Sequence, residues 1–275
     1  MNIDEIVSRF QRLSTIFPFS EAGRLIKNPY TPHSSPPFLP SSFVRLEESI
    51  RFYMETSDPS LIKKYCSLMS IPMIKPPIVA ILATEISMER SYPFTIFSHE
   101  AIHQNSAFSD VAMMEKHGTY IREALNTSEL PPIVKTITVG IGRHGNESYF
   151  MVTELGDLRI NKQLKKKLSE ATGVPNSTMK HHFHINDQGF DPIRNLGLSP
   201  GNVGPFPYFI RRLEHIIFLK KEISCELVAI RFTPFDTLII TEALFEMLMI
   251  AYMKWKGRQI IFIRIDITNT VPPTA

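Results

Sequence analysis

Cysteine is scarce in this sequence, and so is any surplus of charge. Cys66 and Cys225 are the only cysteines among 275 residues, and two lone thiols form neither a disulfide framework nor a zinc site. The formal net charge is only +3, which is too small to indicate a nucleic-acid-binding protein by itself. Any basic binding surface must therefore be local, and a reducing compartment is the simplest setting.

Long apolar runs are also missing. The best candidate for a membrane helix is interrupted by Glu246 and Lys254, whereas a spanning helix needs about 20 consecutive apolar residues. The first residues, Met-Asn-Ile-Asp-Glu-Ile-Val, carry early acids and no apolar core of a signal peptide. We therefore expect a soluble, cytoplasmic protein without a membrane partner.

Proline, by contrast, is abundant, with 21 residues, and it divides the chain. An amphipathic helix is predicted over residues 3–17, where apolar side chains recur every three or four positions. Five prolines between Asn28 and Pro40 then exclude a helix or a regular strand. The prediction is a helical, Pro-rich extension over residues 1–77 and a main domain over 78–275.

The main domain is predicted to interleave strands and helices without a regular βαβ rhythm. This favours an α/β fold of the α+β kind, with a mixed, partly barrel-like sheet surrounded by helices, over a doubly wound sheet. Strands are expected at 131–139, 148–153, 180–185, 215–219, 226–232, 237–240 and 259–267. The expected helices are two short ones over 109–126 separated at Gly118, one between Asn161 and Gly173, a short helix or turn over 186–196, and one from Thr241 to about Trp255.

One charged residue interrupts the first of these strands. Lys135 lies among Ile133, Val134, Ile137 and Val139, which are residue types that fit a half-buried pleated surface. An ammonium group in such a place must reach an exposed end, extend to water or be held in a cleft with a partner. Both a solvated edge-strand lysine and an anion-binding lysine satisfy this pattern.

Two glycine-rich patterns match known motifs without the structural context that those motifs need. Residues 140–145 fit the dinucleotide fingerprint G-x-G-x-x-G, but a strand is predicted after them, so a hairpin loop is the better interpretation. Residues 197–201 fit the serine-hydrolase pattern G-x-S-x-G. Pro200 has no N–H for an oxyanion hole, and no Asp lies between Ser199 and His215, the only downstream histidine.

Three histidines, His181, His182 and His184, cluster in the strand expected at 180–185. On a strand His182 and His184 share a face and are two possible metal ligands, but a site needs a third and usually a fourth ligand. Nothing nearby has the spacing to supply them. Surface histidines are therefore the preferred interpretation, and we expect neither a metal nor a cofactor.

Three segments, in order, resemble the YbaK/ProX-type aminoacyl-tRNA deacylase family, which also supplies the editing insertion of bacterial prolyl-tRNA synthetases. Ile133–Val139 is similar to the lysine-bearing strand of that family. Asp157–Asn161 and the helix after it resemble its "DxRLD" turn, and Leu196–Phe206 resembles its "TGxxPGxVSPF" loop, the Gly-x-x-x-Pro element. The likeness covers roughly residues 85–256.

The resemblance implies hydrolysis of the ester that joins a wrong amino acid to the terminal adenosine of tRNA, with water as the nucleophile. It assigns catalysis to Lys135 and Gly201. It assigns substrate contacts to Thr136, Asn202, Val203, Gly204 and Pro205. The expected partners are aminoacylated tRNA and an associated aminoacyl-tRNA synthetase.

The residue types suit this chemistry. Ester hydrolysis develops an oxyanion, which backbone N–H groups in a rigid loop stabilise. Gly201 lets the backbone approach closely, Pro205 stiffens the loop, and the compact cation of Lys135 suits a terminal phosphate or the ester oxygens. Candidate contacts to tRNA phosphates are Lys162, Lys165, Lys166, Lys167, Arg211, Arg212, Lys220 and Lys221.

Two departures from the family pattern support a second hypothesis. Lys220 and Lys221 stand where members often carry an Asp, and Arg231-Phe232-Thr233-Pro234 replaces a frequent Gly. Such changes can alter substrate choice or abolish hydrolysis. The alternative is a non-catalytic module of the same fold that binds tRNA or a synthetase.

Overall fold

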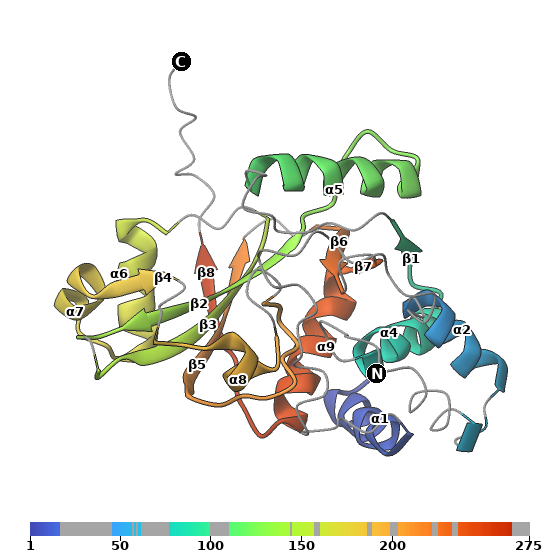
Figure 1. Ribbon diagram of the computed structural model, residues 1–275, viewed down its shortest axis with the longest axis horizontal. Coiled ribbons are helices and arrows are strands. Elements are labelled where there is room, and N and C mark those ends of the chain that lie inside the picture. Colours follow the sequence, from blue (N-terminus) through green and yellow to red (C-terminus); the bar gives the residue numbers. More distant parts are fainter. Residues whose placement is uncertain are drawn as a thin grey trace, which may run out of the picture.

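Helices and strands are interleaved along the chain in the computed structural model (Figure 1), which confirms the expected mixed α/β class. Within the ranges that the structure describes, no helix is both long and apolar enough to cross a lipid bilayer. These ranges are residues 1–16, 46–56, 58, 60–61, 77–99, 110–143, 145–156, 160–185, 189–198, 203–221, 225–232 and 236–265.

The strands form two sheets. The small sheet is antiparallel and has the order β1 (Phe94–Ser98), β7 (Asp236–Thr241), β6 (Leu227–Arg231). The large sheet has the order β4 (Phe183–Ile185), β2 (Val134–Ile141), β3 (Ser148–Leu155), β5 (Leu213–Lys221), β8 (Ile261–Ile265). β2 is antiparallel to β4 and β3, whereas β5 and β8 run parallel to β3, so the large sheet is mixed as expected.

The two sheets meet at the start of β2. Ile133 forms an isolated parallel bridge with Ala229 of β6, and the Ala229 N–H donates a hydrogen bond of 3.0 Å to the Pro132 carbonyl. Further along β2, Val139–Ile141 pairs with β4 instead. The described strands therefore form two open sheets joined at one bridge, and they do not close into a barrel.

The largest apolar core, called the large core below, is covered by α9 (Glu242–Trp255), α4 (Pro77–Arg90) and α1 (Ile3–Ile16). α9 begins as predicted at Thr241, whose hydroxyl accepts a hydrogen bond of 3.2 Å from the Leu244 N–H. Phe10 of α1 is fully buried, and its ring centroid lies 5.5 Å from Tyr252 and 5.7 Å from Trp255. The helix predicted at 3–17 is thus confirmed, and the domain division at residue 77 stays a prediction.

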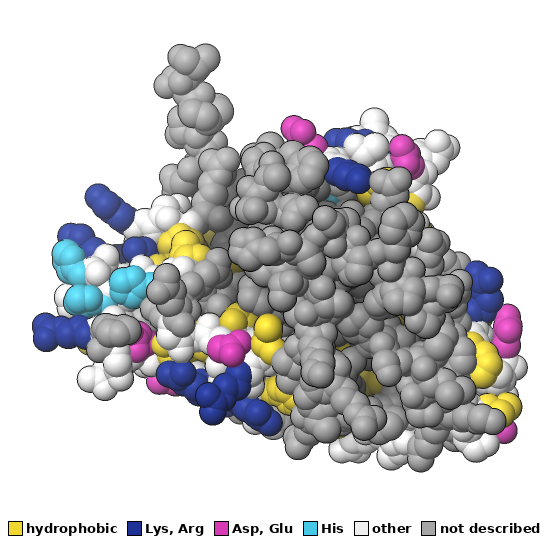
Figure 2. Space-filling view, viewed as in Figure 1, with side chains coloured by type: hydrophobic (Ala, Val, Ile, Leu, Met, Phe, Trp, Pro, Cys, Tyr) yellow, Lys and Arg dark blue, Asp and Glu magenta, His cyan; other side chains and the backbone are white. Residues whose placement is uncertain are grey.

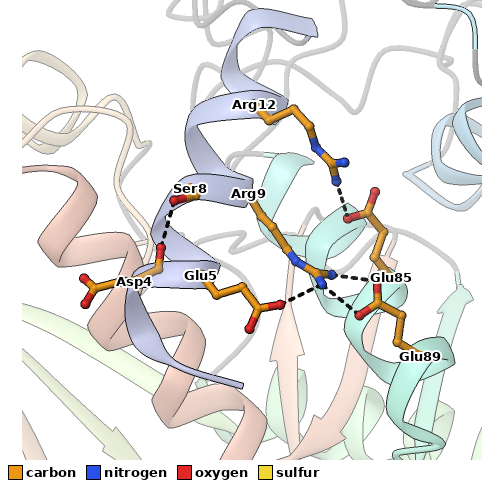
Figure 3. Close-up of polar contacts among 7 residues, drawn as sticks. All are labelled: Asp4, Glu5, Ser8, Arg9, Arg12, Glu85 and Glu89. Carbon is orange, nitrogen blue, oxygen red and sulfur yellow. Dashed lines mark hydrogen bonds and ion pairs between the residues drawn. The ribbon is translucent and has the colours of Figure 1, made fainter.

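Ion pairs connect α1 with α4 at the edge of this core (Figure 3). Two nitrogens of the Arg9 guanidinium donate to the Glu89 carboxylate at 2.8 and 2.9 Å. Arg12 pairs with Glu85 at 3.3 Å. Glu85 also accepts a hydrogen bond of 2.7 Å from the Tyr53 hydroxyl of α2 (Leu46–Thr56). The three helices are therefore linked by polar contacts as well as by the core.

Two smaller cores lie on the opposite face of the sheets. Side chains of a strand alternate between faces: Tyr149 and Met151 of β3 lie in the large core, whereas Phe150 and Val152 lie in a second core. This second core, the α6 core, is covered by α6 (Lys162–Thr172) and α7 (Asn176–His181). A third core, the α5 core, lies under α5 (Asp110–Leu125) and contains Ala229 and Ile239.

The boundaries of α6 follow from its sequence. The Asn161 side chain accepts a hydrogen bond of 2.8 Å from the Leu164 N–H, and Gly173 ends the helix with a left-handed φ of 73°. An Asn cap satisfies an N–H group that has no partner within the helix, and Gly adopts positive φ without steric strain. Both caps confirm the prediction.

Two local predictions are wrong. The two short helices expected over 109–126 are one continuous helix, α5, and Gly118 within it makes room for Leu130: a Cβ there would lie 2.9 Å from Leu130 Cδ1. The strand expected over 180–185 is reduced to β4, because the residues before it form α7 and bury Met179. The short helix expected over 186–196 is α8 (Pro192–Leu196).

Candidate functional site

Lys135 projects on the face of the large sheet that carries the α6 core. It shares this orientation with Ile137, which packs against that core, because the two are separated by one residue of the strand. Its Cα partner on β3 is Glu154, which is 5% exposed. A Glu154 carboxylate oxygen lies 3.6 Å from the ammonium nitrogen of Lys221, at the end of β5. Lys135 therefore belongs to a group of charged residues.

The same group continues into the small sheet. Lys135 lies two residues beyond Ile133, and Arg231 lies two residues beyond Ala229, the bridge partner of Ile133. Because strand side chains alternate with a period of two, Lys135 and Arg231 each project on the face of their own strand that carries Ile133 or Ala229. Burial lowers the pKa of the Arg231 guanidinium.

Thr237 of β7 is the Cα partner of Arg231 and extends the group to a fourth strand. Its side chain is fully buried, and its hydroxyl oxygen lies 2.8 Å from Nε2 of His117 in α5 and 3.0 Å from Nε2 of His99. The ring of Tyr120 stacks on His99 with centroids 5.1 Å apart. These contacts hold the Thr237 hydroxyl in a fixed position.

Glu154, Lys135, Arg231 and Thr237 form what we call the polar row. On one side the row adjoins the α5 core, through Ile133 and Ala229, and on the other it adjoins the α6 core. Apolar surroundings strengthen charge interactions, because the local dielectric constant is low. Among the described residues, Lys221 adds a further cation at the row, 3.6 Å from the Glu154 carboxylate.

The described part of the Gly-x-x-x-Pro loop lies on the other face. Val203 packs against the large core, and Gly204 and Pro205 are buried just before Phe206, a member of that core. Thr136, which alternates with Lys135, hydrogen-bonds Thr153 there with their hydroxyl oxygens 2.9 Å apart. Lys135 is therefore not brought together with these four predicted residues, whereas Gly201 and Asn202 lie outside the described residues.

The predicted tRNA contacts fall into three groups. Lys162, Lys165, Lys166 and Lys167 belong to α6, at the end of the molecule where Lys, Arg and His side chains gather over α6 and α7 (Figure 2). Lys220 and Lys221 end β5, apart from this helix. The Lys165 ammonium lies 4.7 Å from the Phe183 ring centroid, and Lys166 lies 3.9 Å from Glu170.

The third group follows α8. The Arg211 guanidinium lies 4.6 Å from the Phe209 ring centroid, and that of Arg212 lies 4.9 Å from the Tyr149 ring. Arg212 also donates a hydrogen bond of 3.1 Å to the Gly189 carbonyl. These arginines are thus held against aromatic rings, which presents their charge in a fixed orientation.

The structure also decides the meaning of the glycine patterns. Residues 142–147 connect β2 to β3, with positive φ at Gly142 and Gly145, so the hairpin interpretation is confirmed. Gly197 is the left-handed C-cap of α8, so G-x-S-x-G follows a helix instead of the strand that a nucleophile elbow requires.

His182 caps α7 and is not part of β4, so it does not pair with His184 on a strand face as expected. Among the described residues, no three His, Cys, Asp or Glu side chains are grouped to hold a metal ion.

Sequence reasoning found Lys135 but missed its neighbours. Glu154 and Thr237 belong to no recognised motif, and His99 and His117 meet only because both contact β7. Only Arg231 stood out in the sequence, because it replaces a glycine that is frequent in the family that the sequence resembles. Comparisons with models of protein families and with curated proteins gave no match to this sequence.

Proposed function

We propose that this chain hydrolyses mischarged aminoacyl-tRNA, with Lys135 anchoring and polarising the aminoacyl ester. The position of Lys135 carries the proposal, because it projects from a strand between two apolar cores and has the buried Glu154 as its register partner. A cation fixed in such surroundings stabilises the developing oxyanion without the reorganisation that bulk water requires. Water is the nucleophile, and neither metal nor cofactor takes part.

The Gly-x-x-x-Pro loop contributes the second part of the proposed site. In the proposal Gly201 supplies a backbone N–H to the ester oxygen and Asn202 contacts the substrate, as the resemblance implies. The described residues Val203, Gly204 and Pro205 pack on the large-core face, opposite to Lys135, so they do not support this part of the proposal. Thr136 supports the strand through its hydrogen bond to Thr153. The proposal includes a partly barrel-like arrangement of the YbaK kind, in which the bridge between Ile133 and Ala229 joins the two open sheets along one edge of β2.

Basic side chains outside the polar row would hold the body of the tRNA. Lys162, Lys165 and Lys166 lie on one helix, and Arg211 and Arg212 lie on the segment before β5. Contacts of this kind neutralise phosphates without reading sequence. They would bring the aminoacylated 3′ end toward the polar row.

A panel of mischarged tRNAs tests the proposal. Wild-type protein should hydrolyse at least one of them, and Lys135→Ala should lower the rate about 10² to 10³-fold, as expected when one preorganised electrostatic group is lost. Lys254→Ala is the matched control, because this lysine is exposed and pairs with Asp4 at 2.6 Å, away from the polar row. Release of free amino acid is the measurement.

The proposal fails if folded wild-type protein hydrolyses none of the panel. It also fails if Lys135→Ala retains the wild-type rate. Circular dichroism and thermal unfolding of each variant show whether a lost rate reflects chemistry or misfolding.

One observation favours a non-catalytic tRNA-binding or synthetase-associated module. Lys220 stands where the family often has an acid, and its ammonium lies 2.6 Å from Glu246 of α9, so this position serves packing. Such a module would bind tRNA without hydrolysis. Replacing Lys162, Lys165 and Lys166 together should then weaken tRNA binding and flatten its dependence on salt concentration. Fluorescence titration at several salt concentrations measures both, and unchanged titrations would contradict the module.

A further inference from the structure

We propose that double-stranded RNA binds through its phosphates to a basic face of the molecule that α6 and α7 form together. This α6–α7 face consists of Lys162, Lys165, Lys166, Lys180 and His181. The inference rests on the proposed tRNA binding and deepens it. It adds two residues of α7 to the surface, and it names a duplex stem of the RNA as the part that binds there.

Positive charge is concentrated in this part of the chain. Residues 161–185 carry five lysines and one glutamate, a formal charge of +4, whereas the whole chain carries +3, so the rest of the chain amounts to −1. The glutamate, Glu170, lies 3.9 Å from Lys166, and both side chains are more than 60% exposed, so this pair neutralises the face little. Figure 2 shows Lys, Arg and His side chains gathered at this end of the molecule. A local excess of one sign favours a polyanionic partner.

The basic residues of the two helices lie close together because the end of α7 returns to α6. The Lys165 ammonium lies 4.7 Å from the ring centroid of Phe183, the first residue of β4. Phe183 follows α7 after one residue, so the last turn of α7, which carries both of its basic residues, lies beside this part of α6. The His182 carbonyl accepts a hydrogen bond of 3.0 Å from the Gly142 N–H, which fixes the end of α7 against β2.

The face is open to solvent because both helices turn their apolar side chains inward. Leu164 and Leu168 of α6 and Met179 of α7 are buried in the α6 core. Lys162 and Lys166 lie on the opposite side of α6 and are exposed. The two basic residues that follow Met179 are exposed as well. A phosphate can therefore approach these side chains without any change in the fold.

Duplex RNA suits this face better than a single strand does. Single strands are held mainly by aromatic rings on which their bases stack. Phe183 is the only Phe, Tyr or Trp in residues 161–185. It packs against the α6 core, and the Lys165 ammonium lies over its ring. The lysines instead act as point charges for phosphates, which a duplex presents in regular rows while its bases stay stacked.

An anionic membrane suits the face less well than RNA. Helices that bind membrane surfaces insert a broad apolar side below the headgroups. Within residues 161–185, all of which the structure describes, Ile185 is the only large hydrophobic side chain that is exposed. Charge alone therefore has to hold the ligand, and a phosphate backbone meets this condition.

Binding of an RNA hairpin that carries no amino acid tests the inference. The double variant Lys180→Gln, His181→Gln should weaken binding about threefold or more at low salt, and it should lower the slope of log K against log salt concentration by about one unit, as expected for a lost phosphate contact. Lys254→Gln is the control, because this lysine is exposed and pairs with Asp4 at 2.6 Å; its slope should equal that of the wild type. Fluorescence titration at several salt concentrations is the measurement, and an unchanged slope in the double variant would overturn the inference.

Competition experiments with the wild-type protein decide the matter even if the double variant does not fold. The hairpin should bind more tightly than a single-stranded RNA of the same length and more tightly than vesicles of phosphatidylserine and phosphatidylcholine. A preference for the single strand or for the vesicles would overturn the inference.

These results are independent of hydrolysis, because the hairpin carries no ester. Hairpin binding that depends on α7 supports the inference even in a protein that hydrolyses no mischarged tRNA. If the protein hydrolyses mischarged tRNA while the double variant binds the hairpin like the wild type, the inference is wrong and the proposed function stands.

Discussion

At the scale of the residue, the polar row depends on a buried carboxylate. Glu154 is 5% exposed and is the only carboxylate among the described residues of the row and its neighbour Lys221. Removing one partner of a buried ion pair leaves the other charge uncompensated, which destabilises a fold more than replacing both. Glu154 therefore contributes to the stability of the fold through its pair with Lys221.

Replacing Glu154 by Gln should lower the free energy of unfolding by about 1 to 2 kcal/mol, a range below that of fully buried pairs because the Lys221 side chain is 29% exposed. Urea unfolding is the measurement. Glu170→Gln is the control: its pair with Lys166 is 3.9 Å long and both side chains are more than 60% exposed, so we expect a change below about 0.5 kcal/mol. Equal effects of the two substitutions would contradict a special role for Glu154.

At the scale of the element, α1 is fastened by both apolar and charged contacts. Ile6, Phe10 and Leu13 are fully buried, and Arg9 reaches Glu89 with two hydrogen bonds. The hydrogen bond from Arg9 is the main cause that lowers the pKa of Glu89. The unfolded chain therefore binds that proton more tightly than the folded protein does.

The Arg9–Glu89 pair should consequently stabilise the protein above the unfolded-state pKa of Glu, about 4.3, and lose this effect as the pH falls through the lowered folded-state value. A double-mutant cycle with Arg9→Ala and Glu89→Ala should give a coupling of about 0.5 to 1 kcal/mol at pH 7, typical of partly exposed pairs, and none at pH 2. Denaturant unfolding at both pH values measures it. A coupling that persists at pH 2 would show that the contact does not depend on the carboxylate charge.

At the scale of the whole molecule, local signals predicted local structure well. The caps Asn161, Gly173 and Thr241 and the glycines of the β2–β3 hairpin act through neighbouring atoms, so the sequence around them was enough to locate α6, α9 and the hairpin. Gly118 misled, because its small size serves a contact with Leu130, which no helix propensity records.

Less of the candidate site could be predicted from the sequence. Lys135 was recognisable as a charge within an apolar strand, but its neighbours depend on contacts between distant segments. The bridge between Ile133 and Ala229 and the approach of His99 and His117 to Thr237 arise only when the sheets and α5 assemble. No spacing within one segment encodes such contacts.

Among the described strands, the bridge between Ile133 and Ala229 is the one backbone pairing that joins the two sheets. Lys135 belongs to the large sheet and Arg231 to the small one, so any change in the angle between the sheets alters the separation of the two cations. A ligand bound to both cations would restrict changes in the angle between the two sheets. The Ala229 N–H donates a hydrogen bond of 3.0 Å to the Pro132 carbonyl at the bridge between the sheets. The hydrogen exchange of this amide should therefore slow when such a ligand binds, even if no other amide contacts the ligand.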